Sequence, residues 1–391
     1  MIKTENKGTQ LSAYIWADEV EESAWKQINN LTIFPHAFHH IAIMPDVHSG
    51  YGMPIGGVLA TKNVVIPKAV GVDIGCGMNY TQLDLESSSI IKQNVKVVMG
   101  RIRNFIPVGF KHNEHGCNDK DMPDMEKDIV IEKEYDSAKK QLSSLGGGNH
   151  FIEMQENSEG NIGIMIHSGS RNLGFQVAKH YNNIAKEKSK LPKDWELDFL
   201  DINDKDGQDY LKAMNYCLEF ALLNRKRMMD KIKNIIMDVY NKYKTSTGHN
   251  IKFNNDIDCH HNYAVSEIHF GEKVIVHRKG AISAKNGELG IIPGSQGTAS
   301  YIVEGLGNED SFMSSSHGSG RLMSRTRART ELSLENEKQF LDNQGIIHSL
   351  RREKDLDEAP SAYKNIDTVL SNETDLIKPI IKLKPLAIIK G

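Results

Sequence analysis

Cysteine is scarce in this chain, and that scarcity excludes a disulfide framework. The sequence has 391 residues and only four cysteines, at wide spacings and without a Cys-x-x-Cys pair. It also lacks any apolar run long enough to span a bilayer, and its N-terminal residues show no cleavable apolar segment. These absences favour a reducing compartment. We therefore expect a cytoplasmic protein with no membrane contact.

The chain has little excess charge of either sign. Its formal net charge is -3, so no global basic field indicates a nucleic-acid partner. Two local basic stretches remain, RTRAR at residues 325–329 and NRKRMMDK at residues 224–231. We interpret the second as the solvated face of a helix. The first follows a glycine-rich loop and stays a candidate ligand contact.

Familiar nucleotide-binding and zinc-protease motifs are missing as well. The sequence contains no G-x-x-x-x-G-K-[ST] loop, no H-E-x-x-H, no strand-bound G-x-G-x-x-G and no Lys-x-Asp-Gly. If this protein carries out nucleotidyl transfer, its covalent carrier is therefore not a lysine in the usual motif. A histidine becomes the candidate.

Both strand and helix patterns are present. Short apolar runs predict strands within residues 41–66, at residues 161–167 and at residues 273–282. Apolar residues at helical spacing predict one long helix over residues 207–243, with Leu211, Leu222 and Val239 on its apolar face. The motifs that indicate a functional site extend from residue 46 to the C-terminus and are not interrupted by a long linker. We therefore expect a single domain over residues 1–391.

Glycine placement is the most informative feature that the sequence does contain. Five segments put a polar or metal-binding side chain among small residues, where the backbone can approach a ligand closely or turn with positive φ. Five such loops in one chain are hard to explain as turns alone. The segments are GVDIGCG, LGGGNH, HSGSRN, GSQGTAS and SSSHGSGR.

Within these segments and the nearby CHHNYA, a candidate metal-ligand set can be named. Asp73 and Cys76 are three residues apart between glycines, and His150, His167 and His261 recur in loop or strand-end settings. Each residue taken alone is more often structural than functional. Together, a carboxylate, a thiolate and imidazoles suit Mn, Fe, Co or Zn better than Mg or Ca.

The loop SSSHGSGR supplies a candidate nucleophile. His317 stands between hydroxyls and glycines, and Arg321 follows it in the same loop. A phosphate held by backbone N–H groups and by Arg321 could be attacked by the neutral imidazole of His317. The alternative is a surface turn with an incidental histidine.

These blocks together resemble the RtcB family of RNA ligases, in that family's order, from about residue 44 to Gly391. They are MPDVHSGYGMPIGG, VGVDIGCG, LGGGNHFIE, HSGSR, CHHNYA, IPGSQGTASY, SHGSGRLMSR and the terminal KG. The resemblance implies an α+β fold, with mixed and largely antiparallel sheets flanked by helices around a dinuclear metal site. It implies an enzyme that joins RNA 3'-phosphate or 2',3'-cyclic phosphate ends to 5'-hydroxyl ends, in RNA repair or tRNA splicing.

The resemblance also implies cofactors and partners. GTP and two Mn(II) ions would be required, the other partner is RNA, and an activating protein is compatible with the family. His317 would take GMP covalently. Cys76 would bridge the ions, with His150 and His167 completing one site and Asp73 and His261 the other. Of the adjacent histidines, we choose His261 over His260, because His261 precedes the asparagine of the family pattern.

Further residues match positions that contact the guanylate or serve the active site in that family. Lys390 and Glu153 are the matches of most interest after Asn149. The full set is Asp46, Asn149, Glu153, Asn262, Ser295, Ser300, Tyr363 and Lys390, in addition to His317.

Two features stay open, and two rival functions remain. Residues 103–128 have no aligned counterpart and could be an insertion or an RNA-contacting loop. Arg171, Arg321 and Arg325 are candidate phosphate contacts. The rivals are a dinuclear metallohydrolase, which would leave His317 and Lys390 idle, and a non-catalytic RNA-binding relative. The complete ligand set argues against the second.

Overall fold

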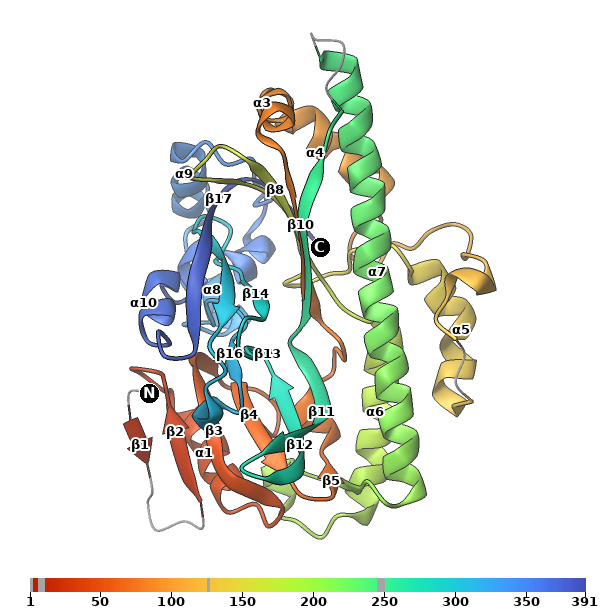
Figure 1. Cartoon of the computed structure of the whole chain (residues 1–391), viewed down its shortest axis with the longest axis vertical. Helices are drawn as coiled ribbons and strands as arrows, with labels where there is room; N and C mark the ends of the chain where they lie inside the picture. Colours follow the sequence, from red (N-terminus) through yellow and green to blue (C-terminus); the bar gives the residue numbers. More distant parts are fainter. Residues whose placement is uncertain (1–2, 6–10, 125–126, 245–249) are drawn as a thin grey trace.

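Two large sheets and one long helix dominate the structure (Figure 1). The computed structural model describes residues 3–5, 11–124, 127–244 and 250–391. Among these residues, neighbouring strands of both sheets pair antiparallel, apart from the parallel pair formed by Ser12–Ile15 and Ala37–His48. The prediction of an α+β fold with mixed, largely antiparallel sheets is therefore confirmed.

The strands form a six-stranded sheet, a seven-stranded sheet and two short ribbons. In spatial order, the six-stranded sheet contains β1 (Lys3–Glu5), β2 (Ser12–Ile15), β3 (Ala37–His48), β4 (Ile55–Thr61), β12 (Glu272–Lys279) and β11 (Asn262–His269). The seven-stranded sheet contains β10 (Phe253–His260), β6 (Gly77–Leu83), β8 (Ile162–Ser168), β7 (Phe151–Asn157), β17 (Ile377–Lys390), β15 (Ser300–Gly305) and β14 (Leu289–Ile292). The ribbons pair β13 (Ala281–Ser283) with β16 (Ser314–Ser316), and β5 (Val64–Val65) with β9 (Leu200–Asp201).

Helices cover the outer faces of these sheets. They are α1 (Glu22–Thr32), α2 (Pro67–Val70), α3 (Leu85–Gln93), α4 (Val95–Phe105), α5 (Ile129–Gln141), α6 (Arg171–Lys188), α7 (Lys205–Tyr243), α8 (Arg325–Glu331), α9 (Leu334–Asn343) and α10 (Ile366–Ser371). Short 3-10 turns include η1 (Asp119–Asp121) and η4 (Glu353–Glu358). Within the described ranges, we find no helix that is both long and apolar enough to cross a membrane.

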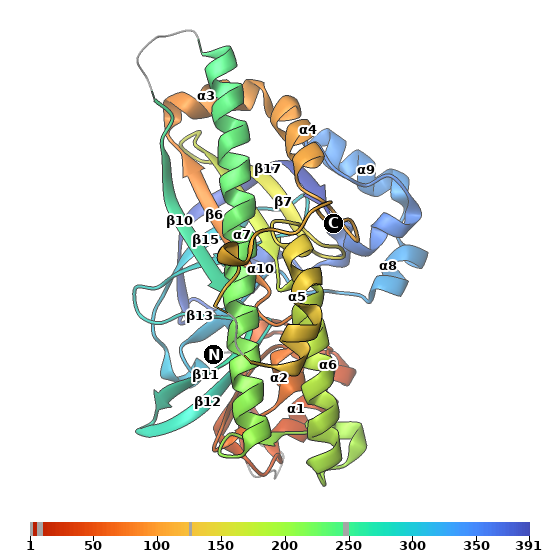
Figure 2. The same cartoon turned by 90° about the vertical axis from the view of Figure 1, so that its right-hand side faces the viewer.

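Helix α7 is the long helix that the sequence predicts, and it begins two residues earlier than expected, at Lys205. Figure 2 shows it running along most of the length of the molecule, with α3 and α4 near one end and α6 near the other. Its Met228 and Ile232 pack in one core cluster with Ile164 and Ile166 of β8. The helix therefore supports the seven-stranded sheet from one side.

The structure corrects the expected faces of α7. Leu222 was predicted on the apolar face but is 42% exposed. The stretch 224–231 was predicted to be a solvated face, but Arg225 is completely buried and pairs with Asp258, Nη2 to Oδ1 at 2.6 Å. Its Nη1 donates to the carbonyl oxygens of Gly75 and Ser168, both at 2.9 Å. A partner on a neighbouring strand, which helical periodicity cannot reveal, explains why Arg225 is buried.

Two further expectations concern segment boundaries. The run at residues 273–282 was predicted as one strand, but it forms β12 and β13, separated at Gly280, where φ is +60°. Residues 103–128 comprise the end of α4, the turn η1 and otherwise irregular chain, while residues 125–126 lie outside the described part.

Candidate functional site

The ends of four neighbouring strands bring the predicted metal ligands together at one end of the seven-stranded sheet. Cys76 immediately precedes β6, His150 precedes β7, His167 lies near the end of β8, and His261 follows β10. Since these strands are adjacent in the order β10-β6-β8-β7 and antiparallel, their alternate ends meet at the same edge. The pairings His260↔Gly77, Gly77↔Ser168 and Phe151↔His167 set this register.

Asp73 joins the same edge from the turn before β6. The backbone N–H of Cys76 donates to the carbonyl oxygen of Asp73 at 3.1 Å, which closes the turn. Asn262 also stabilises this turn, because its Nδ2 donates to the same carbonyl oxygen of Asp73 at 3.2 Å. We call Asp73, Cys76, His150, His167 and His261 the donor edge.

The ligand atoms of the donor edge form two groups that share Cys76. One group is Asp73, Cys76 and His150, and the other is Cys76, His167 and His261, with ligand atoms in each group within 4.8 Å of one another. This grouping differs from the pairing that the resemblance implied, which joined His150 to His167 and Asp73 to His261. Sheet order explains it, since β10 and β8 flank β6, whereas His150 enters beside the Asp73 turn.

Contacts within each group are short. Cys76 Sγ lies 3.2 Å from His167 Nε2 and 3.4 Å from His150 Nε2. His150 Nε2 lies 3.0 Å from Asp73 Oδ2, and His167 Nε2 lies 3.3 Å from His261 Nε2. A thiol carries one proton and cannot donate to both imidazoles, so at least one contact brings two lone pairs together.

The other ring nitrogens are held by the backbone. His150 Nδ1 donates to the carbonyl oxygen of Leu145 at 3.0 Å, and His167 Nδ1 donates to that of Asn149 at 3.2 Å. A carbonyl oxygen can only accept, so both Nε2 atoms carry free lone pairs when the rings are neutral. Burial lowers the pKa of His167 and of His261, which favours the neutral ligand form.

The surroundings of the Cys76 thiol also favour a bound cation. Burial and then the nearby Asp73 carboxylate raise its pKa well above the ordinary value. A buried thiolate beside a carboxylate is costly unless a positive charge compensates. The residues present therefore fit a divalent metal centre with soft and hard ligands.

His317 lies beside the donor edge, immediately after β16. Its ring centroid is 4.9 Å from that of His261. Nδ1 donates to the Asp46 carboxylate at 2.7 Å, and the backbone N–H of His317 donates to the same oxygen at 3.1 Å. Asp46 is completely buried in β3. The carboxylate thus fixes the ring and leaves the Nε2 lone pair available as a nucleophile.

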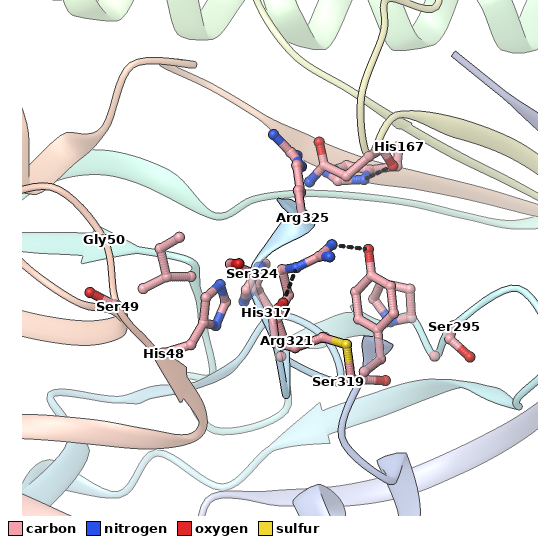
Figure 3. A pocket seen from close by; sticks show the side chains of 18 of the residues that line it. His48, Ser49, Gly50, His167, Ser295, His317, Ser319, Arg321, Ser324 and Arg325 are labelled. Carbon is pink, nitrogen blue, oxygen red and sulfur yellow. Dashed lines mark hydrogen bonds between the residues drawn. The ribbon is translucent and has the colours of Figure 1, made fainter. Parts of the chain in front are cut away.

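A cavity of about 680 Å³ opens next to His317 and the donor edge. Figure 3 shows His48, His317 and Arg321 around it, with Arg325 nearby. Of the predicted guanylate contacts, the side chains that line it are those of Asn149, Ser295, Tyr363 and Lys390. Its size suits a ligand larger than a single phosphate.

The other predicted contacts lie behind the cavity wall. Asp46 holds His317, and Asn262 braces the Asp73 turn. Ser300 Oγ accepts from the backbone N–H of Gly294 at 3.1 Å. Glu153 is buried and accepts from Gln155 Nε2, and burial raises its pKa to about 8.

The candidate phosphate contacts separate into two kinds. Arg321 and Arg325 line the cavity. Arg171 is not among the lining residues, and its Nε donates to Ser144 Oγ at 3.0 Å and its Nη2 to Gly109 O at 3.1 Å. Its observed contacts are therefore those of a structural hydrogen-bond donor that ties two loops together.

Glu358 is a residue of this site that the sequence did not single out. It ends η4, is buried, and accepts from Tyr363 Oη at 2.5 Å and from Lys390 Nζ at 3.2 Å. Arg321 Nη1 and Arg325 Nε lie 3.4 and 3.5 Å from its other oxygen. Burial would raise the pKa of Glu358, but Lys390, Tyr363 and the arginines together hold it below its usual value. We call Arg321, Arg325 and Lys390 the cationic wall.

Two lysines position the loops around the nucleophile and were also missed. Lys279 Nζ donates to the carbonyl oxygens of Tyr51 and Met53 at 2.6 and 3.0 Å, holding the rim loop that contains Ser49 and Gly50. Lys364 Nζ donates to the carbonyl oxygens on either side of Asp46, at 3.0 and 2.8 Å. No glycine-rich motif surrounds either lysine, so only the folded chain reveals them.

Comparison with known proteins shows which family this chain resembles over its length. The model of the tRNA-splicing ligase RtcB family matches residues 27–127 and 111–391. The chain is 36% identical to an Escherichia coli RNA-splicing ligase RtcB, over 95% of both chains. It is 32% identical to the tRNA-splicing ligase RtcB of Nanoarchaeum equitans, over 95% of this chain and 92% of that protein. It is 30% identical to the tRNA-splicing ligase RtcB of Thermococcus kodakarensis, with the same coverage.

Proposed function

Because the chain belongs to the RtcB family, we propose that it is an RNA ligase that uses GTP to join 3'-phosphate or 2',3'-cyclic phosphate ends to 5'-hydroxyl ends. One observation carries the proposal. His317, fixed by Asp46, lines the cavity together with His167 and His261, whose ligand group shares Cys76 with the group of Asp73 and His150. The cavity and donor edge draw on residues from 21 to 390, so we propose that the whole chain acts as one domain.

The chain's own residues suffice to outline the first chemical step. His317 Nε2 attacks the α-phosphorus of GTP, an N–P bond forms, and the bond to pyrophosphate breaks. Asp46 keeps the proton on Nδ1 and stabilises the charge that develops on the ring. The cationic wall lies at the same cavity and would attract the phosphates or the RNA end.

The later steps use the same cavity. GMP passes from His317 to the RNA 3'-phosphate, which makes that end a good electrophile. The 5'-hydroxyl then forms the phosphodiester as GMP departs. A cyclic phosphate end must first be opened by water. Positioning of the two ends supplies much of the rate enhancement in such transfers.

The donor edge would hold the metal ions, for which we propose two Mn(II). Such ions, when bound, neutralise phosphate charge and polarise the oxygens that gain charge in the transfer. Asp73 and His150 would serve one ion, His167 and His261 the other, and Cys76 both. The thiolate and imidazoles favour metals from Mn to Zn over Mg.

Of the remaining predicted contacts, we propose that Asn149, Ser295, Tyr363 and Lys390 touch the guanylate directly. Asp46, Glu153, Asn262 and Ser300 act from behind the wall. A dinuclear hydrolase, the rival function, would have no use for the His317–Asp46 pair or for Lys390. RNA repair and tRNA splicing are the physiological roles that we propose for the ligase.

The decisive experiment is transfer of GMP to the protein. Wild type incubated with GTP and Mn(II) should gain the mass of GMP on intact-mass analysis, and peptide mapping should place it on His317. His317→Ala should bind metal normally and gain nothing, because no neighbouring group has both a nucleophilic lone pair and a matched base. A label on lysine, or a label retained in His317→Ala, would overturn the proposal.

A further inference from the structure

A segment of unusual charge precedes the unaligned residues 103–128 and overlaps their first part. From Ser87 to Asn113 the sequence contains five lysines and arginines and no aspartate or glutamate, although the whole chain has a net charge of -3. This segment contains α4 and the loop that follows it. It is therefore a local positive field on a chain that has none overall.

Most of this charge is not used to stabilise the fold. Lys92 pairs with Glu156, and Arg103 Nη2 donates to Ser349 Oγ at 3.2 Å. Lys96, Arg101 and Lys111 form no ion pair within the described part of the chain. Their charges remain available to a ligand.

Two exposed aromatic residues accompany these cations. Phe105 ends α4 and is 64% exposed, and Phe110 is 99% exposed. Phe110 is the most exposed large hydrophobic side chain in the residues that the structure describes. Arg101 and Phe105 are four residues apart and share one side of α4, which leads into the turn of Phe110 and Lys111. We call Arg101, Phe105, Phe110 and Lys111 the α4 strip.

The loop that presents Phe110 is held in place by hydrogen bonds. Lys111 N–H donates to Val108 O at 3.3 Å, which closes a turn around Phe110. Gly109 N–H donates to Gly146 O at 2.7 Å, and Arg171 Nη2 donates to Gly109 O at 3.1 Å. The exposed ring therefore sits on an anchored turn that keeps it in water.

This turn lies against the glycine loop that leads into the site. Gly146 begins the run that continues through Gly148 to Asn149, which lines the cavity, and His150 of the donor edge. A Cβ atom on Gly148 would lie 3.6 Å from Nη2 of Arg325, another cavity residue. On α4 itself, Arg103 contacts Ser349, whose Oγ donates to Ile388 O of β17 at 3.2 Å. Figure 2 shows α4 on the same side of α7 as the chain's C-terminal end.

We propose that the α4 strip binds the single-stranded part of the RNA substrate next to its reacting end, with a base stacked on Phe110. This inference rests on the proposed function, since it assigns a path to that RNA. Lysines and arginines that track phosphates, combined with an exposed aromatic face, are the means by which proteins hold single strands. A duplex keeps its bases stacked inside and offers Phe110 no free face, so the strip selects an unpaired end.

RNA binding should be measured with a short single-stranded oligonucleotide that ends in a 3'-phosphate, without GTP. Phe110→Ala should weaken the affinity about ten-fold, the effect of losing one base–aromatic stack. Phe110→Trp should retain affinity, and its tryptophan fluorescence should be quenched as RNA is added. Lys111→Gln should reduce the slope of log affinity against log salt by about 0.7, as expected for one lost phosphate contact on a single strand.

Phe175→Ala is the matched control, because Phe175 is a 45% exposed aromatic on α6 and belongs to neither the cavity nor the strip. It should bind RNA as wild type does. Equal affinity of Phe110→Ala and wild type would overturn the inference, and so would an equal effect of Phe110→Ala on a blunt duplex. If the strip instead binds a protein, Phe110→Ala should likewise leave RNA affinity unchanged, and the inference would be overturned.

GMP transfer from GTP, which needs no RNA, separates the two proposals. If Phe110→Ala transfers GMP normally but binds RNA weakly, both hold. If wild type fails to take up GMP, the proposed ligase chemistry fails, and the comparison of RNA affinities still decides the role of the strip.

Discussion

The cationic wall lines the same cavity as His167 and His261 of the donor edge, but the two regions are held in place by different means. Each ligand of the donor edge lies at or near the end of a strand of one sheet, and backbone carbonyl oxygens orient His150 and His167. The cationic wall comes from a loop, the start of α8 and the end of β17, and its three side chains converge on the single carboxylate of Glu358. One region is ordered by the ladder of a sheet, the other by a buried charge.

That difference has a consequence for how each region tolerates change. Many hydrogen bonds between strands position the residues of the donor edge together. Metal binding there should therefore depend on the ligand atoms more than on any single supporting residue. The cationic wall depends on one residue, because removing Glu358 would leave neighbouring positive charges without a common partner. The two regions are joined where Gly391 N–H, next to Lys390, donates to His150 O at 3.0 Å.

The largest effect should come from the atom that both ligand groups share. Cys76→Ser replaces a soft thiolate with a weak hydroxyl ligand, so we expect loss of both metal ions and a fall in ligation of at least about a hundred-fold. Metal content by mass spectrometry and ligation of a labelled RNA measure this. Cys117→Ser, outside the site, is the control and should keep both. Full metal occupancy in Cys76→Ser would contradict a bridging role.

The next largest effect should come from Asp46→Asn. An amide N–H facing Nδ1 of His317 would favour the tautomer with the proton on Nε2, which removes the nucleophilic lone pair. We expect single-turnover GMP transfer to fall about a thousand-fold, in line with similar changes at orienting carboxylates. Metal content should be unchanged.

Asp367→Asn, at a carboxylate on α10 that accepts from Tyr301 Oη, is the matched control and should transfer GMP normally. An unchanged rate in Asp46→Asn would remove Asp46 from the mechanism.

A smaller effect is expected at the cationic wall. Glu358→Gln keeps the shape of the side chain but removes the charge that holds Lys390 and the arginines, so we expect the KM for GTP to rise about ten-fold, with a smaller change in kcat. Discrimination between GTP and ATP should also weaken. Kinetics of GMP transfer with both nucleotides provide the test.

Glu337→Gln is the control for that change, because Glu337 is a buried carboxylate on α9 that accepts from the backbone N–H of Ser361 at 3.2 Å. If Glu337→Gln raised the KM as much as Glu358→Gln, the effect would be one of general stability rather than of the wall.

The smallest effect should be one on stability, at Glu153. Burial raises the pKa of this carboxyl to about 8, above its ordinary 4.5. Between those values, the folded state keeps a proton that the unfolded state has released, so this group makes the free energy of unfolding fall as pH rises. Glu153→Gln has no proton to lose there. The variant should therefore gain stability relative to wild type between pH 5 and pH 8, as roughly the limits of this window.

Denaturant unfolding at several pH values measures this difference, with the exposed Glu159→Gln as the control. If the free energies of unfolding of Glu153→Gln and wild type differed by the same amount at every pH in that range, the raised pKa of Glu153 would be contradicted. The contrast with Glu358, whose pKa is lowered in an equally buried place, would then need another explanation.

How far the sequence could predict the site depended on whether a residue sat in a recognisable local pattern. Cys76, His150, His167 and His317 stand among glycines and small polar residues, and the structure brings them close together, as the pattern led us to expect. Glu358 and Lys364 flank a proline-containing stretch with no such pattern. Their roles arise from contacts with residues more than thirty positions away, Lys390 for Glu358 and Pro45 and Val47 for Lys364, which no local signal encodes.

The sequence by itself predicted the candidate ligand types, a long helix over residues 207–243, which the structure extends to 205–243, and the family to which the chain belongs, because those depend on residue identity and short-range order. Only the tertiary structure decided which ligands group together, that Arg225 is buried beneath the Cys76 turn and that Phe110 stands exposed beside the glycine loop. The physical reason is strand order. Residues 76, 150, 167 and 261 meet only because β10, β6, β8 and β7 are neighbours, and that order follows from packing across the whole chain.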